Sequence, residues 1–435
     1  MSKKASTFKT ILYWLMVVLP IYKDSPLSQY FGAAGYTVII PVAYITFGAI
    51  CWLQERITIN KSLIPLYKLG IWILVVGELA VIVWFIATGK LIALGNFLPF
   101  KAFIVSVEYL AYVVYMSLIL YCIKDQNLDY IFKPIFFTLI LLVVIMLLEI
   151  PQQPFAFREL HFSGVFPYYR VRLLTLESSA TTLPIFVYGL LSIYYSIVSK
   201  RKVRLLVSIG CCLTLFSTTG SKSLVGTIGI LILIYILLRS RQINIKFILM
   251  IPIFVVLVAY VSLVIYPRLS SELSSDINNF TSTATRLYTG LLGLGIGTIF
   301  LFGIGGGIYP MILQSAMATF LPAYSSAFPN YNMSEIQNLI ASTTDNAVTA
   351  KSSGAQYNMY WGIVGTIYLL YYFHNISDRL IKAKVPAQRF IRSIFWTAIY
   401  MVIFIGAWDF EFWLLVALII YLPEITKMKE NMRVE

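Results

Sequence analysis

Long apolar runs follow one another along almost the whole chain, with short polar segments between them. A run of about 20 apolar residues is long enough to cross the hydrocarbon core of a bilayer as a helix. Only 12% of the residues are charged, whereas a soluble domain averages about 25%. A helix satisfies its own backbone polar groups in lipid, where no water is available to do so. We therefore expect an all-α polytopic integral membrane protein.

The apolar runs predict about twelve transmembrane helices. The first run follows three lysines and has no small-residue cleavage site, so it is typical of a retained span and not of a cleavable signal peptide. The expected spans lie near residues 8–22, 31–53, 67–88, 102–123, 131–149, 181–198, 204–218, 223–238, 247–266, 358–376, 390–407 and 411–424.

The basic residues set the expected orientation. The segments 200–204 and 378–392 are strongly basic, and cytoplasmic loops of membrane proteins carry an excess of Lys and Arg. Both termini are then cytoplasmic, and the segments Glu149–Thr182 and 267–357 lie outside. The net charge of +14 is explained by anchoring at the cytoplasmic face, so we expect no nucleic-acid partner.

Five regions follow from this topology. They are N-terminal transmembrane helices at 1–149, an outer catalytic loop at 150–180, central transmembrane helices at 181–266, a large outer region at 267–357, and C-terminal helices with a cytoplasmic tail at 358–435.

A glycine-rich apolar stretch at 290–308 lies inside the large outer region. If it crossed the membrane once, the basic segment 378–392 would face outward. We therefore expect a re-entrant or interfacial element. Its GIGGG sequence at 303–307 follows no strand, so close helix packing explains the glycines better than a nucleotide-binding loop does.

Outer cations form the strongest candidate site. Arg170 and Arg172 present planar forks of donors that suit phosphate oxygens, and Glu177 could act as a general base. The alternative is that the arginines contact lipid headgroups and Glu177 caps a helix. Lys222, Arg268 and Arg286 are further outer cations, and a lysine that reaches the membrane surface is the alternative for Lys222.

Other polar residues carry weaker signals. Glu78 and Glu108 lie within expected spans, where buried acids are functional candidates or pair with one another. His161 fits a loop residue better than a base, and His374, at the cytoplasmic end of an expected span, is expected not to be catalytic. The four cysteines lie in apolar runs without metal-ligand spacing to these histidines, so we expect packing roles, no disulfide framework and no metal site.

The order of several motifs resembles the O-antigen and capsule polysaccharide polymerases (the Wzy family) and the related O-antigen ligases. The motifs are RVRLLTLESSATT, the turn TTGSKS, ATR ahead of LFGIGGGIYP, and AQYNMYWGIVGTIYLLYYF, over roughly residues 160–375. The chain departs from the family pattern in four places. It lacks the proline of the first motif and the proline of the glycine-rich stretch, here Leu301–Gly307. It also has Lys222 in place of an arginine, and Gln356-Tyr357-Asn358 where the family often has a histidine.

The resemblance implies a metal-independent, cofactor-free inverting glycosyltransferase with a GT-C-like fold. Its substrates would be undecaprenyl-pyrophosphate-linked oligosaccharides, polymerised at the outer face of the bacterial cytoplasmic membrane, with a chain-length regulator as a further partner. The expected catalytic residues are Glu177, Arg172 and Arg286. The expected pyrophosphate- and sugar-binding residues are Arg170, Lys222, Arg268, Lys351 and Gln356.

Three other classes stay open, one of them a non-enzymatic membrane scaffold, which leaves the outer arginine clusters without a reason. An O-antigen ligase, or another lipid-linked glycosyltransferase, differs mainly in its acceptor, and the missing histidine argues against the ligase. A flippase or transporter of lipid-linked sugars would favour short loops and internal repeats. The long outer region at 267–357 argues against that class.

Overall fold

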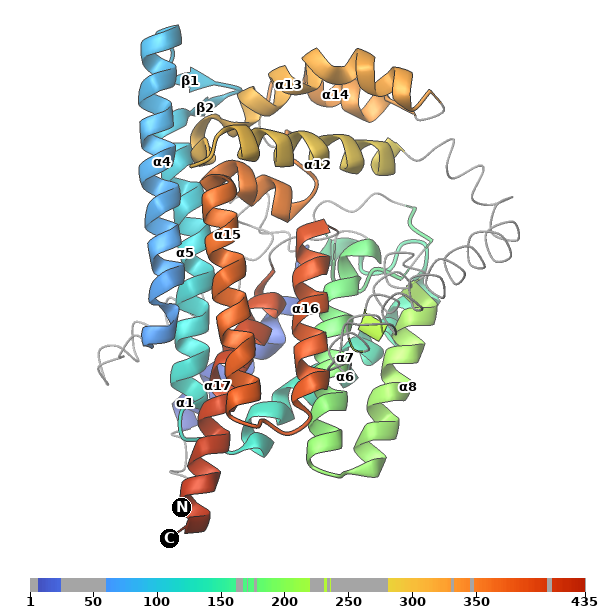
Figure 1. Cartoon of the computed structure of the whole chain (residues 1–435). Coiled ribbons are helices and arrows are strands. Elements are labelled where there is room, and N and C mark those ends of the chain that lie inside the picture. The colour runs from blue at the N-terminus through green and yellow to red at the C-terminus, as the bar shows by residue number, and fades with distance from the viewer. Residues whose placement is uncertain are drawn as a thin grey trace, which may run out of the picture. The chain divides into compact units, whose positions relative to one another are not determined.

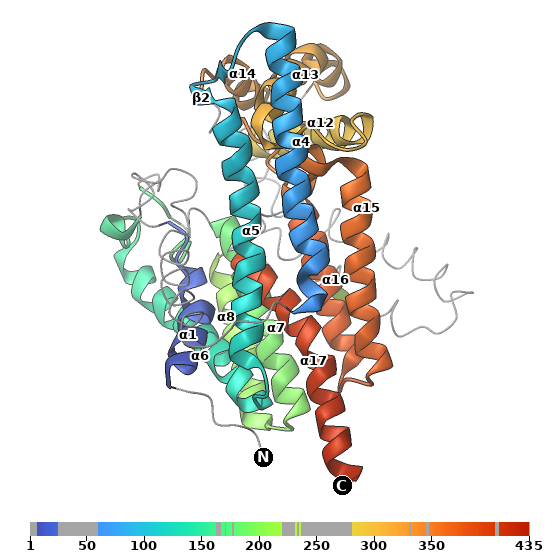
Figure 2. The same cartoon turned by 90° about the vertical axis from the view of Figure 1, so that its left-hand side faces the viewer.

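The computed structural model contains mainly helices, shown from two directions in Figures 1 and 2. They pack into two compact units. Unit 1 is built from Met1–Ile71, Val107–Leu231 and Tyr368–Glu435, and unit 2 from Trp72–Ser106 and Ile232–Ile367. The structure describes residues 7–24, 60–161, 167–169, 171–175, 178–219, 231–232, 235, 281–329, 332–344, 348–404 and 409–434.

Unit 1 contains a helical bundle in which α7 packs against α6, α8, α16 and α17, while α1 packs against α6. Figure 1 shows α7 and α8 as neighbouring helices joined by a short turn. The α-helices are α1 Thr7–Val18, α6 Leu128–Glu149, α7 Thr182–Val198, α8 Lys202–Thr219, α16 Gln388–Phe404 and α17 Phe410–Val434. Short 3₁₀ helices cover Leu19–Ile21, Lys61–Leu63, Ile150–Gln152, Arg158–Leu160 and Ser178–Thr181.

Buried tyrosines tie α1 into this bundle. The hydroxyl of Tyr13 donates to the carbonyl of Ile131 in α6 at 2.8 Å. The hydroxyl of Tyr188 in α7 donates to the carbonyl of Val17 at 2.6 Å. A buried hydroxyl without a partner would cost free energy, so these bonds let large aromatic side chains fill an apolar core.

Unit 2 contains three helices that pack on one another: α12 Thr281–Ile299, α13 Gly305–Ala327 and α14 Ser334–Ala341. Three long helices, α4 Ile64–Thr88, α5 Leu98–Ile123 and α15 Ser353–Lys382, contribute residues to both units. Figures 1 and 2 show α12 and α13 lying crosswise to the part of α4 that belongs to unit 2.

A short β-hairpin with a two-residue turn joins α4 to α5. Strands β1 Ile92–Ala93 and β2 Asn96–Phe97 pair antiparallel, with Ile92 opposite Phe97. The residues between them, Leu94 and Gly95, both have positive φ angles of 48° and 77°. Two central residues with positive φ are what a tight hairpin turn of this kind requires.

Four described segments are long and apolar enough to cross a membrane: Lys61–Thr88, Leu98–Ile123, Leu128–Gln152 and Lys202–Thr219. Thr7–Ile21 and Thr182–Val198 are shorter apolar helices. The part of the chain that the structure describes is therefore mainly helical and has helices suited to a membrane, as the composition predicts.

Helices occupy the positions of nine of the expected spans. The expected spans at 31–53 and 247–266 lie outside the described residues, and the span at 223–238 lies almost entirely outside them. The total of twelve spans and the GT-C-like arrangement stay predictions, as do the membrane orientation and the five regions drawn from it.

Glycines bring backbones into contact in unit 2, as the sequence predicts for the stretch at 290–308. Gly305 has a φ angle of 65°, and a β-carbon there would lie 2.1 Å from Cα of Gly77 in α4. Gly303 has a φ angle of 89°, and a β-carbon there would lie 2.3 Å from the carbonyl oxygen of Tyr360. Only glycine combines a positive φ with such approaches at no steric cost.

The helix α15 is interrupted at Gly362, whose φ and ψ angles are 70° and 179°. The interruption meets the chain between α12 and α13. The amide of Ile304 donates to the carbonyl of Met359 at 2.8 Å, and the amide of Val364 donates to the carbonyl of Leu301 at 3.1 Å. Backbone groups that the helix would have used are therefore bonded to a neighbouring segment.

Candidate functional site

The predicted site residues fall into three groups. Arg172 lies in unit 1, and Arg286, Lys351 and Gln356 lie in unit 2. Arg170, Glu177, Lys222 and Arg268 lie outside the described residues. Their predicted roles stay predictions.

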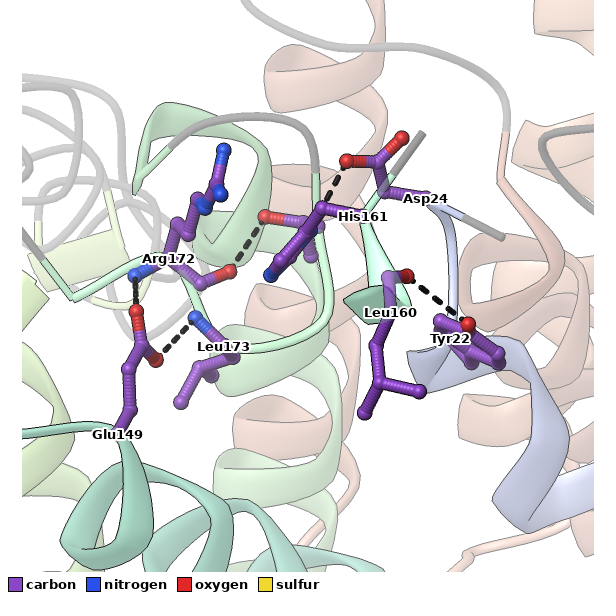
Figure 3. A network of polar contacts seen from close by, with 8 residues as sticks. Tyr22, Asp24, Glu149, Leu160, His161, Arg172 and Leu173 are labelled. Atoms are coloured by element: carbon purple, nitrogen blue, oxygen red, sulfur yellow. Dashed lines mark hydrogen bonds and ion pairs between the residues drawn. The ribbon is translucent and has the colours of Figure 1, made fainter. Parts of the chain in front are cut away.

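The carboxylate of Glu149 holds the segment that carries Arg172 (Figure 3). Glu149 is the last residue of α6, and its Oε1 and Oε2 accept the amides of Arg172 at 2.8 Å and Leu173 at 2.7 Å. The Thr175 hydroxyl donates to the Arg172 carbonyl at 2.7 Å and closes a tight turn. Hydrogen bonds to an ionised acceptor are roughly twice as strong as neutral ones. A buried carboxylate thus fixes the backbone of this predicted site residue.

The Arg172 side chain is itself buried, with 1% of its surface exposed. Its guanidinium lies 4.9 Å from the centre of the Tyr168 ring and points away from the Glu149 carboxylate in Figure 3. Burial lowers the pKa of Arg172, and electrostatic interactions with Asp24, Tyr168 and Glu149 act in the opposite direction. An arginine stays charged in proteins, so a cation is kept inside unit 1.

Asp24 and His161 form a second buried contact in the same region (Figure 3). Asp24 Oδ2 lies 2.9 Å from His161 Nδ1, and neither side chain is exposed. His161 directly follows the 3₁₀ helix Arg158–Leu160. The Tyr22 hydroxyl donates to the carbonyl of Leu160 at 2.9 Å. The end of the first apolar segment therefore reaches this part of the loop.

The same chain end is also bonded to the turn after Arg172. The amides of Lys23 and Asp24 both donate to the carbonyl of Leu174, at 2.9 and 3.2 Å. Residues 22–24 consequently connect the His161 region with the Arg172–Thr175 turn. Arg172 and the Asp24–His161 pair are held on one bonded framework.

A buried lysine joins this framework to the start of α17. Lys23 Nζ lies 2.5 Å from Asp409 Oδ2 and 3.2 Å from Glu411 Oε1. The side chains of Lys23 and Glu411 are 8% and 0% exposed. Burial disfavours the charged form of Lys23, but the carboxylates of Asp409 and Glu411 favour it, and the net effect raises its pKa.

These side chains make up what we call the buried polar cluster. Among the described residues, every Asp, Glu, Lys, Arg and His classed as buried belongs to it: Lys23, Asp24, Glu149, His161, Arg172 and Glu411. Buried ionisable groups are rare and costly unless they are paired. Their concentration at one place in a chain this apolar marks the cluster as the candidate functional site.

In unit 2, Glu335 brings two predicted features together. Its carboxylate accepts the Thr285 hydroxyl at 2.9 Å and lies 3.6 Å from Nζ of Lys351. Thr285 precedes Arg286 on α12, so the helix that carries Arg286 is joined to the segment that carries Lys351. The Lys351 and Glu335 side chains are 35% and 31% exposed. Gln356 donates to the Tyr360 hydroxyl within α15.

The remaining candidates are less enclosed. Glu78 is half-buried and Glu108 is exposed. They lie in different units, so their predicted pairing stays a prediction. His374 pairs with Asp378 one helical turn away at 3.2 Å, and its side chain is 57% exposed. Among the described residues, no group of three His, Cys, Asp or Glu side chains is placed to hold a metal ion.

Sequence reasoning missed most of the cluster. It gave His161 a loop role, named Glu149 only as the start of the outer loop, and gave no role to Lys23, Asp24 or Glu411. One signal was available, since each of the last three stands next to the end of an apolar run. Nothing in the sequence pairs them, because the contacts join positions more than a hundred residues apart.

Comparisons with protein-family models, with curated proteins and with solved structures found no match for this chain. The resemblance to polysaccharide polymerases therefore stays a prediction based on the order of motifs.

Proposed function

We propose that the chain is a membrane glycosyltransferase that polymerises lipid-pyrophosphate-linked oligosaccharide repeats. The observation that carries the proposal is the buried polar cluster, which holds Arg172 in a fixed backbone turn beside apolar helices. A lipid-linked pyrophosphate needs an apolar surface and a group of cations. Its polyprenyl chain belongs in the bilayer, and its phosphates need cations at the membrane boundary.

Arg172 would stabilise the pyrophosphate as it leaves. Negative charge develops on a departing pyrophosphate, and a cation fixed in advance lowers that barrier. The Glu149 carboxylate fixes the backbone at Arg172 in advance, because it accepts the amides of Arg172 and Leu173. Because Arg172 is 1% exposed, the groups that cover it, with the Tyr168 ring 4.9 Å away among them, have to move aside when substrate binds.

Arg286 and Lys351 are the second set of proposed phosphate ligands. Lys351 is paired with Glu335, and an incoming phosphate would compete with this carboxylate for the ammonium group. The proposed proton acceptor for the attacking sugar hydroxyl is Glu177. Among the described residues, His161 is a further candidate acceptor, and its Nδ1 faces the Asp24 carboxylate. Such a partner fixes the tautomer and orientation of an imidazole.

A second candidate function is proton-coupled movement of the same lipid-linked sugars. It is favoured by the paired, buried ionisable groups Asp24, His161, Lys23 and Glu411, since buried acids and bases serve as proton relays in transporters. Gel analysis of the surface glycan in a deletion strain separates the candidates. A single repeat unit remaining indicates a polymerase, loss of all units indicates a flippase, and free polymer on the lipid carrier indicates a ligase.

The direct test uses purified protein with a lipid-linked repeat unit and measures polymer length. Arg172→Lys and Arg286→Lys keep the charge but lose the planar fork, so polymer should fall strongly. Arg158→Lys is the matched control, because Arg158 lies in the same loop and is exposed. Polymer length with Glu177→Gln and with His161→Gln then identifies the group that accepts the proton. Near-normal polymer from both arginine variants at normal protein levels would remove the pyrophosphate-binding role proposed for Arg172 and Arg286.

A further inference from the structure

The chain between α12 and α13 exposes a cluster of large apolar side chains, which we call the apolar tip. Phe300, Leu301 and Phe302 are 45%, 53% and 57% exposed, and Ile299 before them is 77% exposed. Apolar exposure of this density is unusual on a surface that meets water. The question is what covers it.

The contacts of the tip with α4 set its depth along that helix. The indole Nε1 of Trp72 donates to the carbonyl of Phe302 at 3.2 Å, and the two rings lie 5.8 Å apart. A few residues later, Gly305 lies against Gly77. The tip is thus level with the stretch of α4 around Trp72 and Gly77.

This stretch is the middle of a candidate membrane span. Lys61–Thr88 has 28 residues and qualifies as a span by length and hydropathy. The hydrocarbon core of a bilayer takes up about 20 helical residues. Wherever a core of about 20 residues is placed within Lys61–Thr88, it includes positions 69 to 80. Trp72 and Gly77 therefore lie at hydrocarbon depth in every such placement.

Three backbone carbonyls of the tip meet the requirement that this depth imposes. Irregular backbone in hydrocarbon must have its polar groups bonded within the protein. The carbonyl of Phe302 has the Trp72 indole, and the carbonyl of Leu301 has the amide of Val364. The carbonyl of Phe300 accepts the amide of Gly303 at 2.7 Å. The side chains are exposed while these three carbonyls are satisfied.

We infer that Phe300–Phe302 is a re-entrant tip whose side chains contact the acyl chains of the bilayer. The interruption of α15 at Gly362 and the Trp72 indole supply the hydrogen bonds that let this irregular segment stay in hydrocarbon. The inference assigns a lipid-contact surface to unit 2. It does not depend on the proposed glycosyltransferase activity.

Spin labels attached to single cysteines in lipid nanodiscs test the contact. Three full-length variants are compared, in a background whose four native cysteines are replaced by alanine and which elutes like the wild type. In Phe302→Cys, collisions with oxygen should dominate over those with a water-soluble nickel chelate, as in Leu79→Cys on the exposed face of α4. Lys90→Cys, two residues beyond the end of α4 and exposed, should show the reverse.

Two results would overturn the inference. Preference for the nickel chelate at position 302 would place the tip in water. Poor access to both reagents would mean that another part of the protein covers it.

A second measurement concerns the hydrogen bond between Trp72 and Phe302 itself. Trp72→Phe should lower the melting temperature more than Trp84→Phe, because Nε1 of Trp84 has no hydrogen-bond partner among the described residues. Equal losses would contradict the role given to Trp72.

Discussion

Asp24 Oδ2 lies 2.9 Å from Nδ1 of His161, and both side chains are fully buried. The chain contains two histidines, and the other, His374, also contacts an aspartate. That second pair joins neighbouring turns of one helix and is 57% and 34% exposed. The same two residue types therefore occur in one chain as a buried long-range pair and as an exposed local pair.

A double-mutant cycle should separate the two pairs. Residues in direct contact within a network couple by about 0.5–3 kcal/mol, and we expect Asp24→Ala with His161→Ala near the upper end because neither side chain is exposed. The matched cycle, Asp378→Ala with His374→Ala, should give less than about 1 kcal/mol, since exposed pairs contribute little. The measurement is the free energy of unfolding in detergent. Equal coupling in both cycles would show that burial adds nothing to the Asp24–His161 pair.

Glu149→Gln should destabilise the protein by about 1.5–3 kcal/mol, the range for hydrogen bonds to charged groups. An amide offers one acceptor oxygen, so one of the two backbone amides at Arg172 and Leu173 loses its bond. Glu159→Gln is the control, because Glu159 is exposed in the same loop. Chemical unfolding in detergent gives the comparison. Similar small changes in both variants would remove the role that we give to the Glu149 carboxylate.

Lys23→Met should cost about 3–5 kcal/mol near neutral pH, because the carboxylates of Asp409 and Glu411 lose their buried counter-charge. The pKa of Lys23 in the folded protein is raised above its ordinary value of 10.5. Its contribution to stability is therefore fully present below that ordinary value and is lost as pH rises through the raised folded value.

The difference in stability between wild type and Lys23→Met should accordingly narrow only in strongly alkaline solution. Unfolding measured across the alkaline range checks this. Lys382→Met, which changes an exposed lysine, should differ little from wild type throughout. A difference that stays constant through strongly alkaline solution would contradict the role that we give to the Lys23 charge.

Gly305→Ala should strongly reduce the amount of folded protein. The substitution places a β-carbon 2.1 Å from Cα of Gly77 at a φ angle of 65°, so one backbone has to move. Gly290→Ala is the control, since no atom lies within 4 Å of a β-carbon there and alanine favours a helix by about 1 kcal/mol. Size-exclusion profiles and melting temperatures of both variants decide the matter. Normal folding of Gly305→Ala would show that unit 2 has another packing available.

Topology is tested with an impermeant maleimide in intact cells. Single cysteines at Ser163 and Ser325 should be labelled, because the charge asymmetry places both outside. A cysteine at Lys202 is expected to be protected. Protection at both serines would reverse the orientation that we predict.

The sequence by itself determined the helical membrane class and the place of most helices. The apolar runs between 64 and 149 become α4, α5 and α6 within a few residues of their predicted ends. These features are local, because a run of apolar residues excludes water and forms its hydrogen bonds within one segment. The packing role of the glycines at 303–307 was predictable for the same reason, since a missing side chain is visible in the sequence.

Only the tertiary structure brought Asp24 to His161, Glu149 to the amide of Arg172, and Lys23 to Glu411. These partners are separated by 137, 23 and 388 positions. A charge at the end of an apolar run has low cost if it stays in water, and it needs a partner only when folding buries it. Which carboxylate meets which cation depends on how the ends of α1, α6 and α17 are packed. That arrangement is a property of the assembled bundle, and no single segment contains it.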